Sequence, residues 1–157
     1  MEDINVIEQD LAHRDITKTG GELLTFFVEG QTYGLEIQYV TDIIEIQPIT
    51  VIPKIPKYIE GVINLRGKVI PVMNVRSRFG KDHIDYDERT CIIVVEMDDI
   101  SVGLIVDRVS EVISVLASQL TPPPNNKTVN ANKYIKHLVN TDDDVIFILD
   151  SNKIIID

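Results

Sequence analysis

The feature that most constrains this fold is the shortness of the apolar runs and the regularity with which turn residues interrupt them. Two pairs of short runs stand on either side of glycine-containing turns, which is typical of β-hairpins. The turns are Glu29–Thr32 and Arg66–Lys68, and the arms are Leu24–Val28, Tyr33–Ile37, Glu60–Leu65 and Val69–Met73. About nine or ten such strands, with no long helical pattern, predict an all-β barrel or sandwich.

Four further segments give more specific expectations. Cys91–Glu96 is almost continuously β-branched, which predicts a strand buried on both faces. Asn132–Leu138 is expected to form one or two helical turns. Pro71 has no N–H to donate to a ladder, so its strand is expected at a sheet edge or a bulge. Asn74 is suited to cap a short helical turn over Val75–Phe79.

The length of the chain, 157 residues, is enough for one domain. Residues 1–20 run into the chain-breaking stretch Thr17–Gly21 and are expected to be a flexible tail, with residues 21–157 as the folded domain. The longest apolar runs have about five residues, against roughly 20 for a membrane span, which predicts no membrane insertion. The single cysteine, Cys91, is expected to be a packed core thiol in a reducing cytoplasm.

The charge of the chain is strongly acidic but unevenly distributed. The net charge is −10, whereas residues 54–81 hold seven basic residues and one acidic residue. An acidic protein is a poor general polyanion binder, since affinity for nucleic acid depends on neutralising phosphates. The basic segment indicates a surface made for a particular partner, or charges that disperse over solvated faces once the chain has folded.

Catalytic and metal-binding patterns are absent from the sequence. The three histidines have no serine or cysteine beside them in a nucleophile motif. The acidic segment Asp82–Glu88 lacks the spacing of a zinc site or of a calcium-binding loop. Gly61, Gly67 and Lys68 have one residue too many between the glycines for a phosphate-binding P-loop, and they join two strands. These observations predict no catalytic residue, no metal and no cofactor; a hydrolase that uses the Asp82–Glu88 loop is the remaining enzymatic alternative.

The most distinctive stretch is Gly61–Gly80, a hairpin with a guanidinium at its tip. Arg66 offers five donors in a rigid fork, which suits a carboxylate on a partner and equally suits a carboxylate within the chain. Gly61 and Gly67 permit turn geometry and a close approach of backbones. The residues alone leave both interpretations of Arg66 open.

This stretch closely resembles the signature of the CheW family of chemotaxis adaptors. The family motif is a Gly-Val-x-Asn-Leu-Arg-Gly hairpin, then a proline-containing strand and a Leu/Val-Arg-x-x-Phe turn. Tyr33–Ile37 with Val40 is similar to the family's first hairpin, and Val102–Val112 is similar to its second conserved block. The similarity covers about residues 22–150, most of the chain.

The resemblance implies two small SH3-like, five-stranded β-barrels that share a hydrophobic core. Members have no enzymatic activity, and they bind the cytoplasmic tip of methyl-accepting chemoreceptors and the regulatory domain of the histidine kinase CheA. The expected protein is therefore a non-enzymatic adaptor that couples chemoreceptors to CheA. It is expected to be a monomer in isolation, to lie in the cytoplasm at the inner face of the membrane in receptor arrays, and to bind no nucleic acid.

The resemblance also implies which residues meet the receptor. Arg66 matches the family's hairpin-tip arginine, and Val40 and Asp42 match positions that affect partner binding, although the family more often has Glu in place of Asp42. Val112 matches an apolar position on the side where receptor helices dock. The hairpin-shaping residues are Gly61, Asn64 and Gly67. From the residues alone, Val40 and Val112 are equally well explained as core members.

Two alternatives remain beside the adaptor. CheV-like proteins and CheA itself contain a domain of this type, but a CheV needs a receiver domain for which 157 residues leave no room. A nucleic-acid-binding barrel would use residues 54–81, yet only Tyr58 and Phe79 offer aromatic platforms there. A salt-sensitive gel shift would support that second alternative.

Overall fold

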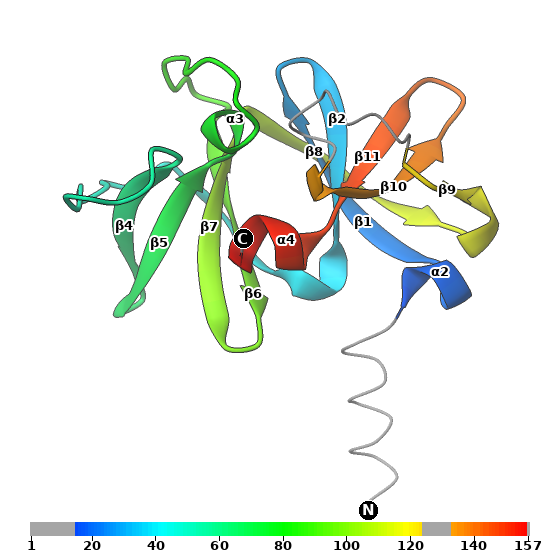
Figure 1. The fold of residues 1–157 in the computed structure, drawn as a ribbon, viewed down its shortest axis with the longest axis horizontal. Coiled ribbons are helices and arrows are strands. Elements are labelled where there is room, and N and C mark those ends of the chain that lie inside the picture. Colours follow the sequence, from blue (N-terminus) through cyan, green and yellow to red (C-terminus); the bar gives the residue numbers. More distant parts are fainter. Residues whose placement is uncertain (1–14, 124–132, 157) are drawn as a thin grey trace, which may run out of the picture.

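The computed structural model, which describes residues 15–123 and 133–156, consists of two β-sheets side by side (Figure 1). The first sheet has the strand order β8-β1-β2-β11-β10-β9. Its strands are β1 (Gly21–Val28), β2 (Gln31–Glu36), β8 (Arg108–Val115), β9 (Leu120–Thr121), β10 (Ile135–Asn140) and β11 (Val145–Leu149). The second sheet has the order β3-β6-β7-β5-β4. Its strands are β3 (Val40–Glu45), β4 (Ile59–Leu65), β5 (Lys68–Asn74), β6 (Cys91–Met97) and β7 (Ile100–Val106).

The helices are short and lie at the ends and connections of the strands. They are α2 (Ile16–Thr19), η1 (Ile37–Tyr39), α3 (Val75–Arg78), η2 (Ala117–Gln119) and α4 (Ser151–Ile156). In Figure 1, α4 lies between the two sheets. None of the helices in the described part of the chain is long and apolar enough to cross a membrane.

Three hairpins follow directly from local turn chemistry. The two central turn residues have positive φ in each, at Glu29 and Gly30, at Arg66 and Gly67, and at Asp98 and Asp99. Two-residue turns of this kind match the right-handed twist of the flanking strands. The hairpins β1–β2 and β4–β5 form at the two turns predicted from the sequence, and β6–β7 is a third hairpin of the same kind.

Hydrophobic side chains form three clusters, and the largest is shared by both sheets. On β6, Ile93 and Val95 point into the shared cluster, whereas Ile92 and Val94 point into a cluster inside the second sheet. This alternation follows from the period of two in a strand. A third cluster lies inside the first sheet, and Ile154 of α4 is fully buried in the shared cluster. Each sheet thus has its own interior, and the two are joined by a common core.

The predicted all-β fold is confirmed, with two differences in detail. The first sheet has six strands, because the two-residue β9 adds to β10. Within the described residues the hydrogen-bonded ladders do not close into barrels, since β8 and β9 are the edges of the first sheet and β3 and β4 those of the second. Both sheets nevertheless wrap around their own apolar cluster, as an SH3-like unit does.

Two predictions about local structure are only partly right. Of the segment Asn132–Leu138, for which the sequence predicts helical turns, Lys133 and Tyr134 lie in a 3-10 turn, whereas Ile135–Leu138 belong to strand β10. This strand pairs with β11 on one side and β9 on the other; Asn132 lies outside the described residues.

The strand with Pro71 is not an edge strand, since β5 lies between β7 and β4, but the β4–β5 ladder does have an irregularity beside Pro71, between Ile59 and Gly61. Pro71 is tolerated because it pairs only with Val62, and the ladder to β7 begins at Val72.

The boundary of the expected tail also differs from the structure. Residues 1–14 lie outside the described residues, but Asp15 caps helix α2 by accepting the Thr17 N–H at 2.9 Å. Ile16 is buried in the cluster inside the first sheet. Residues 15–20, the last part of the expected tail, are therefore held against the first sheet, because the buried Ile16 anchors them.

Candidate partner-binding site

The tip of the β4–β5 hairpin presents Arg66 to solvent. The Asn64 side-chain oxygen accepts the Gly67 N–H at 2.9 Å, which closes the turn. Arg66 and Gly67 have φ of 53° and 82°, so both stand in the left-handed region that this turn requires. The Arg66 side chain is 76% exposed. Asn64 and Gly67 therefore hold the turn in this shape, and the turn projects the guanidinium outward.

Arg66 has a carboxylate partner within the chain. Its Nη1 lies 2.6 Å from Oδ2 of Asp42, whose side chain is 19% exposed. Asp42 belongs to β3 and Arg66 follows β4, and these strands are the two opposite edges of the second sheet. The ion pair therefore links the two edge strands of that sheet, and we call this place the Arg66–Asp42 corner. An exposed ion pair of this kind contributes about 0–1 kcal/mol to the free energy of unfolding. The other N–H donors of the Arg66 guanidinium face solvent.

Val40 lies near the same corner but points inward. It pairs with Val95 while Asp42 pairs with Val94, so Thr41 is an extra residue in a bulge. Val40 is half-buried and packs on the shared core. Ile43, which sequence reasoning missed, is exposed on the neighbouring position of β3. The sequence carries no signal for this exposure, because Ile43 and Ile44 are adjacent apolar residues and only the strand pairing decides which of them faces solvent.

Val112 lies on the other sheet, away from the strands that carry Arg66 and Asp42. It stands on edge strand β8 opposite Leu24 and is 49% exposed. The register of the β1–β8 ladder shifts at Thr25, between Leu24 and Phe26. There the Thr25 side chain takes the place of a backbone partner: its hydroxyl donates to the Glu111 carbonyl at 2.7 Å and accepts the Glu111 N–H at 3.1 Å. The structure thus unites Arg66, Asp42 and Val40 on the second sheet and puts Val112 on a surface of the first.

Gly61 has a different role from Gly67, because it lies in strand β4 and not in the turn. Its φ is 150°, and a Cβ there would lie 2.2 Å from the Thr50 carbonyl oxygen. Beside it, Thr50 and Val62 exchange two backbone hydrogen bonds of 2.9 Å. Gly61 therefore lets the segment 48–56, which contains three prolines, pack against edge strand β4. This segment partly covers the edge.

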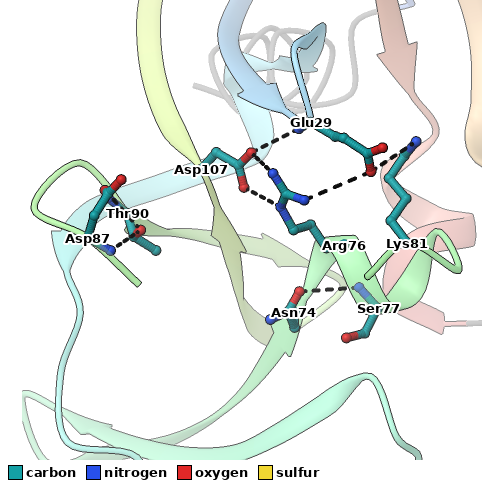
Figure 2. A network of polar contacts seen from close by, with 8 residues as sticks. All are labelled: Glu29, Asn74, Arg76, Ser77, Lys81, Asp87, Thr90 and Asp107. Atoms are coloured by element: carbon teal, nitrogen blue, oxygen red, sulfur yellow. Dashed lines mark hydrogen bonds and ion pairs between the residues drawn. The ribbon is translucent and has the colours of Figure 1, made fainter. Parts of the chain in front are cut away.

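A polar network that sequence reasoning missed joins the two sheets (Figure 2). Arg76 of α3 donates Nε to Asp107 Oδ1 at 2.8 Å and Nη2 to Asp107 Oδ2 at 2.6 Å. The Glu29 N–H, in the β1–β2 turn, donates to the same Asp107 Oδ2 at 2.8 Å. The Glu29 carboxylate lies 3.6 Å from Lys81 Nζ and 3.9 Å from Arg76 Nη1. A turn of the first sheet is thereby fixed to a helix of the second.

The network also shifts the acid–base properties of its members. Burial acts to raise the pKa of Asp107, but the bonds from Arg76 and from the Glu29 N–H outweigh it, so the pKa lies below its usual value. The bond to Asp107 raises the pKa of Arg76. Arg76 and Asp107 both stand in the sequence blocks quoted above, so only their contact was missing from the sequence-based interpretation.

The remaining candidate chemistry is structural. Within residues 15–123 and 133–156, no three His, Cys, Asp or Glu side chains are placed to hold a metal ion. In the acidic loop, Asp87 accepts the N–H groups of Arg89 and Thr90 at 2.8 and 3.1 Å, which holds the loop in shape. Burial raises the pKa of the Cys91 thiol, so it is a weaker nucleophile than an exposed cysteine.

Comparison with known proteins gives a consistent result. The model of the CheW-like domain matches residues 22–157. The chain is 38% identical to the chemotaxis protein CheW of Thermotoga maritima over 136 residues, which is 85% of this chain and 87% of that protein. It is 33% identical to CheW of Bacillus subtilis over 138 residues, or 88% of each. The crystal structure of the scaffolding protein TtCheW from Thermoanaerobacter tengcongensis superimposes with a TM-score of 0.78 at 37% identity, and covers 83% of this chain and 89% of that one.

The matched range, residues 22–157, spans both sheets and contains the Arg66 hairpin and the residues Arg76 and Asp107. A family match over more than half of the chain, relatives above 30% identity and a shared fold all agree. The chain belongs to the CheW family of chemotaxis proteins.

Proposed function

We propose that this chain is a non-enzymatic chemotaxis adaptor that couples chemoreceptors to the histidine kinase CheA. The observation that carries the proposal is the match of a CheW-like domain to residues 22–157, over both sheets and their common core. The folded unit in this proposal is residues 21–157 together with the short helix α2. The adaptor works in the cytoplasm, at the inner face of the membrane, in receptor arrays.

The geometry supplies two surfaces on one rigid body. The Arg66–Asp42 corner lies on the second sheet and Val112 lies on the first, and the shared core fixes one relative to the other. We assign both surfaces to receptor binding, with Arg66, Asp42 and Val40 on the second sheet and Val112 on the first. Val112 supplies an exposed apolar anchor for an amphipathic helix, and Arg66 supplies a charge-assisted bond.

The internal ion pair sets how Arg66 acts. When a partner carboxylate approaches, the guanidinium can use its outward donors and keep its bond to Asp42, since five donors are available. Each contact is then modest, and the array gains strength from many adaptors bound at once. Val40 contributes by holding the strand that carries Asp42 against the core, which is a positioning role.

The test is binding of the purified chain to a chemoreceptor signalling fragment and, separately, to the CheA regulatory domain. We expect the wild type to bind both, and Arg66→Ala and Val112→Asp to weaken receptor binding at least about fivefold with CheA binding kept. Lys18→Ala, on exposed helix α2, is the matched control and should bind as the wild type does. Wild-type protein that is folded but binds neither fragment contradicts the proposed function.

If Arg66→Ala loses CheA binding and keeps receptor binding, the Arg66–Asp42 corner contacts CheA and not the receptor. Light scattering on the chain alone checks the proposed monomer. Unchanged binding of both partners by folded Arg66→Ala and Val112→Asp would show that neither residue belongs to a partner surface.

A further inference from the structure

A pocket of about 330 Å³ opens beside the Arg76–Asp107 network, on neither of the surfaces described above. It lies where the β1–β2 turn, the loop over residues 82–90 and the start of β8 meet. Phe27 and Ile84 form its apolar walls, and Arg89 and Arg108 form its cationic part; Gly30, Asp87, Thr90 and Asp107 complete it. This combination of an apolar wall and cations is typical of a site for an anion carried on an apolar group.

The two carboxylates in the wall are already engaged. Asp107 accepts two bonds from Arg76 and one from the Glu29 N–H. Asp87 Oδ1 accepts the N–H groups of Arg89 and Thr90 within its own loop. Asp85 and Glu88 belong to the same loop but do not line the pocket.

The two guanidiniums, in contrast, form no direct ion pair in the described part of the chain. The pKa of Asp87 is lowered mainly by the hydrogen bonds that this carboxylate accepts, and the charge of Arg89 contributes to the lowering at longer range. Both Arg89 and Arg108 are exposed, and in the described residues no carboxylate oxygen lies within 4.0 Å of either guanidinium. The Arg108 guanidinium carbon stands 4.3 Å from the centre of the Phe27 ring. Stacking on a ring orients the guanidinium and leaves its edge donors free for a planar carboxylate.

We propose that this pocket binds an acidic side chain, flanked by an apolar one, from a partner protein of the adaptor. The choice of a protein partner follows from charge and size. The chain carries a net charge of −10, which repels free anions. An acidic side chain on a protein that is already docked elsewhere on the adaptor reaches the pocket at a high local concentration, which offsets this repulsion. The volume also lies near the lower end of small-molecule sites, which span roughly 300–1,000 Å³. The assignment of the acidic side chain to a partner of the adaptor rests on the proposed function. That the pocket binds a carboxylate next to an apolar group is independent of that function.

The first experiment tests the chemistry with the full-length chain and a small probe. Phenylacetate is titrated into ¹⁵N-labelled protein, with phenethylamine as a probe of similar shape and opposite charge. We expect shifts confined to the amides of Phe27, Ile84, Arg89 and Arg108 with phenylacetate only. Arg108→Gln and Arg89→Gln should each weaken phenylacetate binding at least about fivefold, while Lys18→Gln, which removes one charge elsewhere, should not. No localised shifts, or equal shifts with phenethylamine, would overturn the site.

The second experiment tests the source of the carboxylate. The receptor fragment and the CheA regulatory domain are each titrated with the wild type, Arg108→Gln, Arg108→Lys and Lys18→Gln. We expect Arg108→Gln to weaken one partner at least about fivefold and to reduce its salt dependence, with Lys18→Gln unchanged. Phenylacetate binding with both partners unaffected would make the ligand a free carboxylate and overturn the partner assignment. A wild type that binds neither partner refutes the proposed function and this partner assignment, and the phenylacetate titration still decides the site separately.

Discussion

Replacing Asp107 by Asn tests whether the Arg76–Asp107 contact holds the two sheets together. The substitution keeps the shape of the side chain but removes its charge and one of its two acceptor oxygens. Arg76 is only 12% exposed and Asp107 is 24% exposed, so the guanidinium would lose its counter-charge while largely buried. Breaking a fully buried pair costs about 3–5 kcal/mol, and breaking an exposed one costs about 0–1 kcal/mol. Arg76 and Asp107 are partly exposed, and Asn keeps one acceptor oxygen, so the cost lies between these limits. We expect Asp107→Asn to lower the free energy of unfolding by about 2 kcal/mol.

The assay is thermal and urea unfolding, with a matched control. For a chain of this length, a loss of about 2 kcal/mol lowers Tm by about 6 °C. Asp42→Asn breaks an ion pair of the same 2.6 Å length, but its Arg66 is 76% exposed, so we expect a loss below about 1 kcal/mol. Equal losses for the two variants, or a loss below about 0.5 kcal/mol for Asp107→Asn, would refute the reasoning from burial.

The same variant gives a pH dependence with a defined sign. The pKa of Asp107 in the folded chain lies below its usual value, so the folded state favours the ionised carboxylate. The stabilisation is therefore fully present above the unfolded pKa of about 3.9 and is lost as the pH falls through the folded value. The difference in stability between the wild type and Asp107→Asn should stay constant between about pH 5 and pH 7 and shrink below pH 4. A difference that grows on acidification would contradict the assignment.

Three further predictions concern the core and the backbone. Gly61→Ala should cost at least about 2 kcal/mol in urea unfolding, because its Cβ would meet the Thr50 carbonyl, whereas Gly67→Ala, with free space around it, should cost about 1–2 kcal/mol from positive φ alone. A smaller loss at Gly61 than at Gly67 would speak against the docked segment. Leu104→Ala, fully buried in the shared core, should lose about 2–5 kcal/mol by calorimetry, and a loss below about 1 kcal/mol would contradict a tightly packed core. Cys91 should react with a thiol reagent at pH 8.5 more slowly in folded than in urea-unfolded protein, because burial raises its pKa; equal rates would show an accessible thiolate.

Local chemistry explains why much of the fold could be predicted from the sequence. The turns at Glu29–Gly30 and Arg66–Gly67 depend on positive φ angles, which Gly30 and Gly67 adopt readily and which mark these two positions as turns. Asn74 caps α3 by accepting the Ser77 N–H three residues later at 3.2 Å. The buried strand β6 follows from its run of β-branched residues. The resemblance to the family then supplied the two-unit architecture and the hairpin-tip Arg66.

Tertiary structure decided everything that depends on which strands become neighbours. Arg66 and Asp42 lie 24 residues apart, and Arg76 and Asp107 lie 31 apart. The sequence contains each of these residues but not their pairing, because contacts across sheets arise from long-range packing. The same cause makes Ile135–Leu138, which were expected to be helical, part of β10, and it places Pro71 in an interior strand. Local preferences therefore determined the hairpins, and the shared core determined which side chains the hairpins bring together.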